Sequence, residues 1–282
     1  MVSQLQVMSS YTLLQSSIAL PTLVQQAHSQ GYSALALCDV NVTYGLVDFY
    51  KLAHQAHLKP LLGMTLQVGG LVDQQTTYPW LVLAKNNQGY QQLLKLSTAV
   101  MTTTTPLTLQ DEQIELTDLI LIAPPEGELK TCLAQDSTIL QQWSQNLRAI
   151  KPQDLYIGVS LRKDFAPQAP MIARWAELQQ LPIVALDHVQ YLKPQDAFAT
   201  AVLQHIERGE KITHYQAQGD YYLRSAQEFQ ADFQAHDLKS ALDNTEKIAA
   251  QCNVQIPFIR TQLPNYPTPK QVSSINYLTQ LV

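Results

Sequence analysis

Short runs of apolar residues alternate along the chain with longer stretches in which apolar residues recur at helical spacing. Runs that are apolar almost without interruption are typical of strands buried on both faces of a parallel sheet, and helices between them indicate βαβ units. The expected strands are Leu5–Val7, Leu35–Leu37, Pro60–Leu66, Trp80–Ala84, Leu119–Ala123, Leu155–Ser160 and Pro182–Leu186. Seven sequential units predict an α/β fold, a closed or nearly closed barrel rather than an open sheet.

The last part of the chain follows a different pattern. Its composition changes near Gly209–Gly219, and beyond that point helical stretches at Ser225–Phe233 and Leu238–Cys252 follow without further strands. We therefore predict a barrel over residues 1–208 and a small helical appendage over residues 209–282.

Some helix ends can be predicted from single residues. Ser225 with Glu228 three residues later is a capping-box signature, and Asn86 is suited to cap the helix that runs through Tyr90. The stretch Ser273–Val282 begins another helical pattern and stops without a cap, so we expect the chain to be a fragment of a longer one.

Charge and cysteine content exclude some classes of function. A net charge of -5 argues against strong sequence-independent binding of nucleic acid by this chain alone. Its three cysteines are far apart, with no C-x-x-C, which fits a reducing compartment. No Lys or Arg occurs before Lys51, and the longest apolar runs, such as Leu119–Pro125, are too short to span a bilayer. We expect a cytoplasmic protein without membrane contact.

Active sites of parallel barrels lie at the carboxyl ends of the strands. The first strand end carries Gln6, Met8, Ser9 and Ser10, and the second carries Cys38, Asp39, Val40 and Asn41. The third carries Gly63, Met64 and Thr65, and the last carries Asp187, His188, Val189 and Gln190. These segments have the form of active-site loops, yet they hold few of the histidines that such loops usually present.

The first sixty residues, opening with "QVMSSYTLL", resemble the start of the alpha subunits of bacterial DNA polymerase III, where a PHP domain lies. Blocks further along agree in order and spacing, among them "LVLAKNNQGYQQLLKL", "VALDHVQYLKPQDAFATAVLQHIERGEKI" and "ALDNTEKIAAQCNV". The resemblance covers essentially the whole chain. It implies a distorted (β/α)7 PHP barrel with a small C-terminal helical appendage.

The resemblance also implies which positions held metal in related domains. Active PHP domains bind two or three divalent ions through His-x-His, Asp-His, Glu and Asp-x-His, side chains that suit Zn, Mn or Fe. Those positions fall here on Gln6 and Met8, on Asp39 and Val40, on Thr65, and on His188 and Gln190. Asp39 alone keeps its ligand type, and His188 stands where an Asp belongs. We predict a degenerate site with no metal and no catalytic residue.

The family further implies a parent chain that is a DNA-directed DNA polymerase with Mg²⁺ in a palm domain outside these residues. This domain would need no cofactor and would have a structural role. Its partners would be the remainder of the polymerase chain and replisome subunits, including a proofreading exonuclease, and DNA would be met only through the parent chain.

Other interpretations of single residues stay open. Asp39 and His188 could form one weak metal site, or each could hydrogen-bond nearby groups instead. Asp187–His188 could be a shifted ligand pair, although adjacent residues of an extended segment point to opposite faces. His54 and His57 could chelate a metal on a helix.

A nucleophile is also conceivable at Ser9, Ser10 and Tyr11, but no general base has an assigned place beside them. At the level of function, the alternatives are a residual metal-dependent phosphoesterase or 3′–5′ proofreading exonuclease, and a freestanding PHP-like adaptor.

Overall fold

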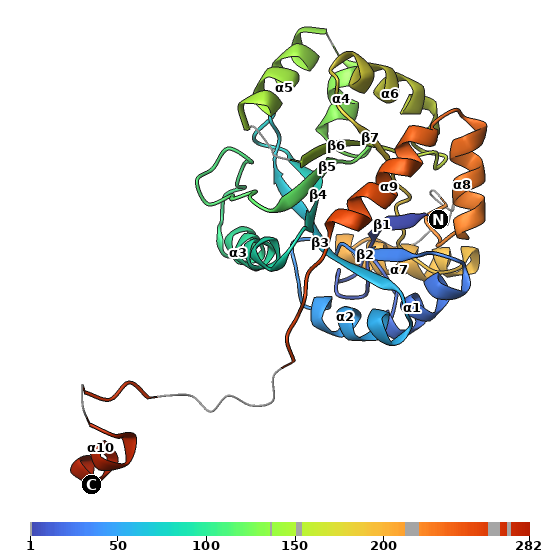
Figure 1. Ribbon diagram of the computed structural model, residues 1–282. Coiled ribbons are helices and arrows are strands. Elements are labelled where there is room, and N and C mark those ends of the chain that lie inside the picture. Colours follow the sequence, from blue (N-terminus) through green and yellow to red (C-terminus); the bar gives the residue numbers. More distant parts are fainter. Residues whose placement is uncertain (1, 136, 151–153, 212–219, 259–265, 270–271) are drawn as a thin grey trace.

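The computed structural model describes residues 2–135, 137–150, 154–211, 220–258, 266–269 and 272–282. Within these residues seven strands form one sheet in the order β1 to β7 (Figure 1). They are β1 Ser3–Val7, β2 Ala34–Leu37, β3 Lys59–Gly69, β4 Thr77–Ala84, β5 Leu119–Ala123, β6 Asp154–Val159 and β7 Ile183–Ala185. Every strand expected from an apolar run is present.

The helices are α1 Leu20–Ser29, α2 Leu46–Gln55, α3 Asn87–Thr102, α4 Glu128–Ala134, α5 Ser137–Ile150, α6 Ala169–Leu178, α7 Ala197–Arg208, α8 Ala226–Ala235, α9 Lys239–Gln251 and α10 Ser274–Leu281. Short 3-10 turns precede α6 and α7 at Ala166–Gln168 and Pro194–Asp196. In the described part of the chain, no helix combines the length and the apolar composition that a bilayer span requires.

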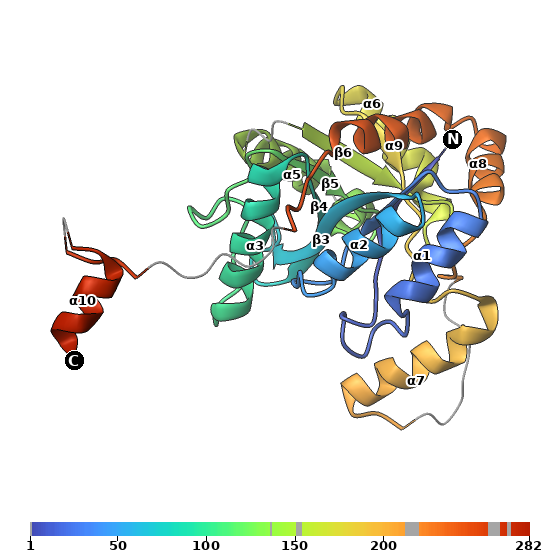
Figure 2. The same cartoon turned by 60° about the horizontal axis from the view of Figure 1, so that its bottom comes forward.

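The sheet curls into a distorted α/β barrel with helices along its outer side (Figures 1 and 2). An isolated parallel bridge between Val7 and Val189 links the segment after β7 to β1, and the Met8 amide donates to the Val189 carbonyl at 3.0 Å. One apolar layer fills the space between the sheet and the helices, with Leu37, Val82 and Ile157 among its members. The barrel expected from the sequence is confirmed.

Strand β4 differs from the expectation of parallel βαβ units, which is wrong at this point. It runs antiparallel to both β3 and β5, whereas the other neighbouring pairs are parallel. Only residues 70–76 separate β3 from β4, and a parallel crossover needs about a dozen residues or more. The Glu128 carboxylate fixes this connection by accepting the amides of Leu71, Val72 and Asp73 at 2.6, 3.0 and 2.9 Å.

Helix α9 closes the interior of the barrel at the amino ends of the parallel strands. Its Ile248 and Ala249, with Cys252 just after it, belong to the inner apolar cluster that also contains Leu5. The Asn244 side chain donates to the Ile183 carbonyl at 2.7 Å, at the start of β7. The polar groups described below lie at the opposite end of the barrel, at the carboxyl ends of the parallel strands.

Two predicted helix caps are confirmed. Asn86 accepts the amides of Gln88 and Gly89, and Ser225 forms a reciprocal capping box with Glu228. The division at residue 209 stays a prediction, and residues 212–219 of the composition change lie outside the described part.

Candidate functional site

The predicted site lies at the carboxyl ends of the parallel strands, beside a cavity of about 530 Å³. Glu126, His188 and Gln190 follow β5 and β7, and they line the cavity together with Gln204 of α7 and Tyr221. The strand ends supply some of the lining because parallel strands finish at one edge of the barrel. This is the edge at which the sequence pattern placed the candidate residues.

A hydrogen-bond network joins three strand ends at this cavity. The buried Gln6 side chain donates through Nε2 to Oε1 of Glu126, and His188 Nδ1 lies 3.3 Å from the same oxygen. Burial opposes the ionisation of Glu126, but the hydrogen bonds that its carboxylate accepts from His188 and Gln6 outweigh this effect. The pKa of Glu126 therefore lies below its ordinary value.

The network continues on the other side of the His188 ring. His188 Nε2 lies 3.2 Å from Gln190 Nε2, and Gln204 donates to Gln190 Oε1 at 3.3 Å. One tautomer satisfies all of these contacts, in which Nδ1–H donates to Glu126 and Nε2 accepts from Gln190. Both ring nitrogens of His188 are then engaged by protein groups.

Asp39 bonds to a different part of the site. Its carboxylate accepts the Ser9 amide at 2.7 Å, the Ser9 hydroxyl at 2.8 Å and the Thr12 hydroxyl at 2.7 Å. Burial raises the pKa of Asp39, and these hydrogen bonds act in the opposite direction. Asp39 thus anchors the loop after β1. Ser9 is fully buried with its hydroxyl donating to Asp39, which does not suit a nucleophile.

The remaining predicted positions hold the backbone of the strand ends together. The Thr65 hydroxyl donates to the Cys38 carbonyl at 2.9 Å, and Val40 pairs with Thr65 in a parallel bridge. Met8 pairs through its backbone with the segment after β7, as described above. The apolar side chains of Met8 and Val40 offer no oxygen or nitrogen to a hard divalent ion.

A second charge cluster, centred on the fully buried Asp187 and Arg162, lies directly beside the network. Asp187 is bound by two guanidinium groups: Arg162 after β6 donates from Nη2 at 2.8 Å, and Arg224 donates from Nε and Nη2 at 3.2 and 2.8 Å. Arg224 also pairs with Asp232 of α8. Asp187 and His188 therefore turn to separate partners, as expected for adjacent residues of an extended segment.

The side chains present do not fit a cluster of metal ions. In the residues that the structure describes, no group of three or more His, Cys, Asp or Glu side chains is arranged to hold a metal. The donors nearest to such a role, Asp39 and His188, are each bound by other protein groups. The His54 ring packs edge-on against the Tyr50 ring, with 4.3 Å between the ring centroids. His57 lies beyond the end of α2 with a positive φ of 56°.

Sequence reasoning missed Glu126, Arg162, Arg224 and Gln204. A signal existed for two of them, since Glu126 closely follows β5 and Arg162 closely follows β6. The rule that strand ends carry the site applied equally to these two strands.

The chain belongs to the PHP domain family, whose model matches residues 4–161. It is similar to the DNA polymerase III subunit alpha of Bacillus subtilis, 31% identical over 98% of this chain and 25% of the relative. The same subunit of Escherichia coli is 29% identical over 98% of this chain and 25% of that protein. The chain thus spans about a quarter of the length of these curated relatives.

A solved structure of an amidohydrolase from Chromobacterium violaceum matches the fold, with a TM-score of 0.50 and 12% identity. It covers 67% of this chain and 88% of that one. At this identity the likeness concerns the fold, and it supports the distorted barrel.

Proposed function

We propose that this chain is the PHP domain of a replicative DNA polymerase III alpha subunit, and that within that enzyme it has a structural role in place of metal chemistry. The family match and the two alpha subunits to which the chain is similar support the first part. The division into a barrel over residues 1–208 and a helical part over 209–282 that leads towards the polymerase palm belongs to the same proposal.

One observation carries the structural role. At the positions where the family resemblance expects metal ligands, Gln6, His188 and Gln190 bond to one another through Glu126 and through the His188 ring. Asp39 bonds to its own loop. A divalent ion would have to displace these protein donors before it could bind.

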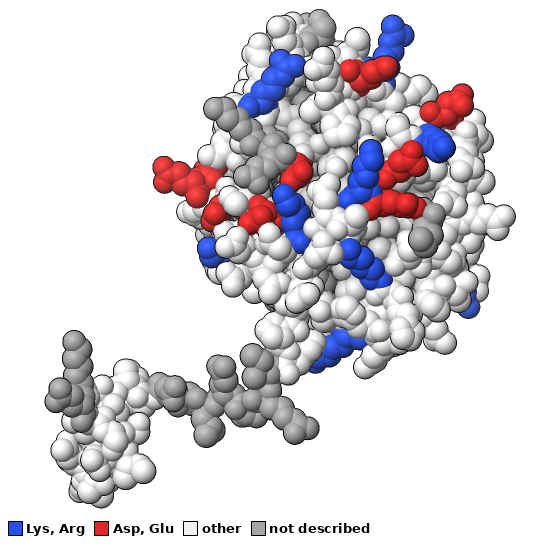
Figure 3. Space-filling model, viewed as in Figure 1, with Lys and Arg blue, Asp and Glu red and all other residues white. Residues whose placement is uncertain are grey.

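The partners follow from the same proposal. They are the remainder of the polymerase chain and replisome subunits, a proofreading exonuclease among them, in the cytoplasm. Mg²⁺ would serve the palm of the parent chain and not this domain. We propose that DNA is contacted only through the parent chain. On the face shown in Figure 3, Lys and Arg side chains are interspersed with Asp and Glu and form no continuous basic patch.

The test is metal retention, measured by elemental analysis after exposure to Zn²⁺ and Mn²⁺ and removal of free ions. The comparator is one variant that restores the family ligands: Gln6→His, Met8→His, Val40→His, Thr65→Glu, His188→Asp and Gln190→His. We expect the native chain to retain substoichiometric metal. The comparator, if its thermal unfolding shows that it is folded, should retain more.

Activity assays on a phosphomonoester and on the 3′ end of single-stranded DNA accompany the metal measurement. Stoichiometric metal on the native chain with hydrolysis of either substrate would contradict the structural role and favour a residual phosphoesterase or exonuclease. Failure of the chain to support primer extension when joined to a polymerase body would instead favour a freestanding adaptor.

A further inference from the structure

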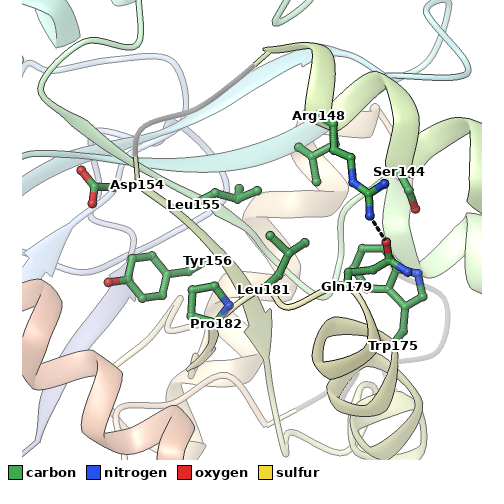
Figure 4. A pocket seen from close by; sticks show the side chains of 10 residues that line it. Ser144, Arg148, Asp154, Leu155, Tyr156, Trp175, Gln179, Leu181 and Pro182 are labelled. Atoms are coloured by element: carbon green, nitrogen blue, oxygen red, sulfur yellow. Dashed lines mark hydrogen bonds between the residues drawn. The ribbon is translucent and has the colours of Figure 1, made fainter.

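A second cavity, of about 390 Å³, is lined in part by residues at the starts of β6 and β7, the strand ends opposite to those that carry the predicted metal positions (Figure 4). It opens between α5 and α6 and reaches the start of β6 and the segment that leads into β7. Cavities of this size are large enough for a small molecule or for one anchoring side chain.

The walls of this cavity are mainly apolar. Leu147 of α5, Leu155 and Tyr156 of β6, and Leu181 and Pro182 before β7 surround it. Trp175 of α6 adds an indole that is 7% exposed. An apolar group of a ligand would leave water on entering and would gain contacts with these side chains.

Hydrogen-bond donors gather at one end of the cavity. Arg148 donates from Nη2 to Oε1 of Gln179 at 2.7 Å, and Figure 4 shows Gln179 and Trp175 beside each other next to this guanidinium. That bond uses the acceptor of the Gln179 amide and one of the Arg148 donors. Within the described residues, neither the Gln179 amide nitrogen nor the Trp175 indole nitrogen donates a hydrogen bond.

Charge is distributed unevenly along the cavity. In the described part of the chain, no carboxylate forms a salt bridge with Arg148. The acidic residue that lines the cavity, Asp154, lies at the other end in Figure 4 and is bound by Lys85 Nζ at 2.7 Å. The end that holds Arg148 is therefore rich in donors and positive, and its acceptors, the Ser144 hydroxyl and the Gln179 amide oxygen, are uncharged.

We propose that this cavity binds a carboxylate attached to an apolar group. The planar guanidinium of Arg148, already oriented by Gln179, suits two parallel hydrogen bonds to a carboxylate. The apolar group would lie against Leu155, Leu181 and the Trp175 ring. Two sources share this chemistry, a free aromatic or aliphatic acid and the C-terminal carboxylate of a peptide that ends in an apolar residue. The proposal is independent of the metal site and of the PHP function.

The experiment titrates the full chain with 3-phenylpropionate and with its neutral amide, following the indole N–H signal of Trp175 by NMR. A capped peptide ending in Phe is tested as the free acid and as the C-terminal amide. Arg148→Gln removes the charge at an exposed position, where the fold should tolerate it. Arg174→Gln is the matched control, because Arg174 is an exposed arginine of α6 that does not line the cavity.

We expect at least one of the two acids to bind with a dissociation constant of about 1 mM or lower and both amides to bind more weakly. Arg148→Gln should weaken binding of that acid about tenfold or more, and Arg174→Gln should leave it unchanged. Binding of the peptide acid alone would assign the source as a peptide terminus. Equal binding of acid and amide, equal effects of the two variants, or no binding by either acid would overturn the proposal.

Discussion

Replacing Asp187 by Ala should destabilise the barrel more than any single change at an exposed charge. Asp187 and Arg162 are both 0% exposed, and Arg224 is 7% exposed. Both guanidinium groups donate to the Asp187 carboxylate. Without this carboxylate, Arg162 has no other acidic side chain at the same short distance. The structure gives that cation no access to water.

The magnitude follows from this geometry. Removing one partner of a buried ion pair costs about 3–5 kcal/mol of unfolding free energy, because the other charge stays buried without compensation. The carbonyl of Asp220 accepts from Arg162 and Asp232 pairs with Arg224, so part of the charge remains satisfied. We therefore expect a loss of about 3 kcal/mol, at the lower end of that range.

Urea denaturation followed by tryptophan fluorescence measures this loss. Asp48→Ala is the control, since Asp48 pairs with Lys51 at 3.9 Å with 63% of its side chain exposed, and such pairs contribute at most about 1 kcal/mol. The double variant Asp187→Leu with Arg162→Met should recover part of the loss, because it removes the buried cation as well as its partner. A loss for Asp187→Ala no larger than that of Asp48→Ala would refute the reasoning.

Three further changes test other contacts. Glu126→Gln should lower the unfolding free energy at neutral pH. The hydrogen bond from His188 lowers the pKa of Glu126, so the ionised carboxylate stabilises the fold above about pH 4.5, and this stabilisation is lost as the pH falls further. The unfolding free energies of the variant and the native protein should therefore converge at acidic pH. Glu128→Ala should cost about 2–4 kcal/mol in urea unfolding, since three amides lose their acceptor. Ser225→Ala should cost about 1 kcal/mol by the same measurement.

The sequence predicted the strands well because continuous apolar runs depend mainly on burial. Both faces of β2 and β5 are buried, so each residue of these strands is apolar. Burial says nothing about direction, and for this reason the reversal of β4 was missed. The informative feature was the short connection of residues 70–76, which has room for a hairpin but not for a crossover helix.

The site was predicted in part. Gln6, His188 and Gln190 were located through the family resemblance, and the structure brings them into one network. Glu126 was missed because it has no place in the ligand motif and lies 120 residues from Gln6 in the chain. A hydrogen bond between positions so far apart depends on how the barrel closes, which no local pattern encodes.

The buried carboxylates at these strand ends each accept hydrogen bonds from donors of the chain. Asp39 has the donors of Ser9 and Thr12, Glu126 has His188 and Gln6, and Asp187 has two arginines. An uncompensated carboxylate in such a place would be costly, and a metal ion is one way to compensate it. Here hydroxyl, amide, imidazole and guanidinium groups of the chain supply most of that compensation, while the buried Oε2 of Glu126 has no hydrogen-bond partner among the described residues. An ion entering the native site would have to displace these donors, and the variant that restores the family ligands should retain more metal because it also removes Gln6, His188 and Gln190 from the network.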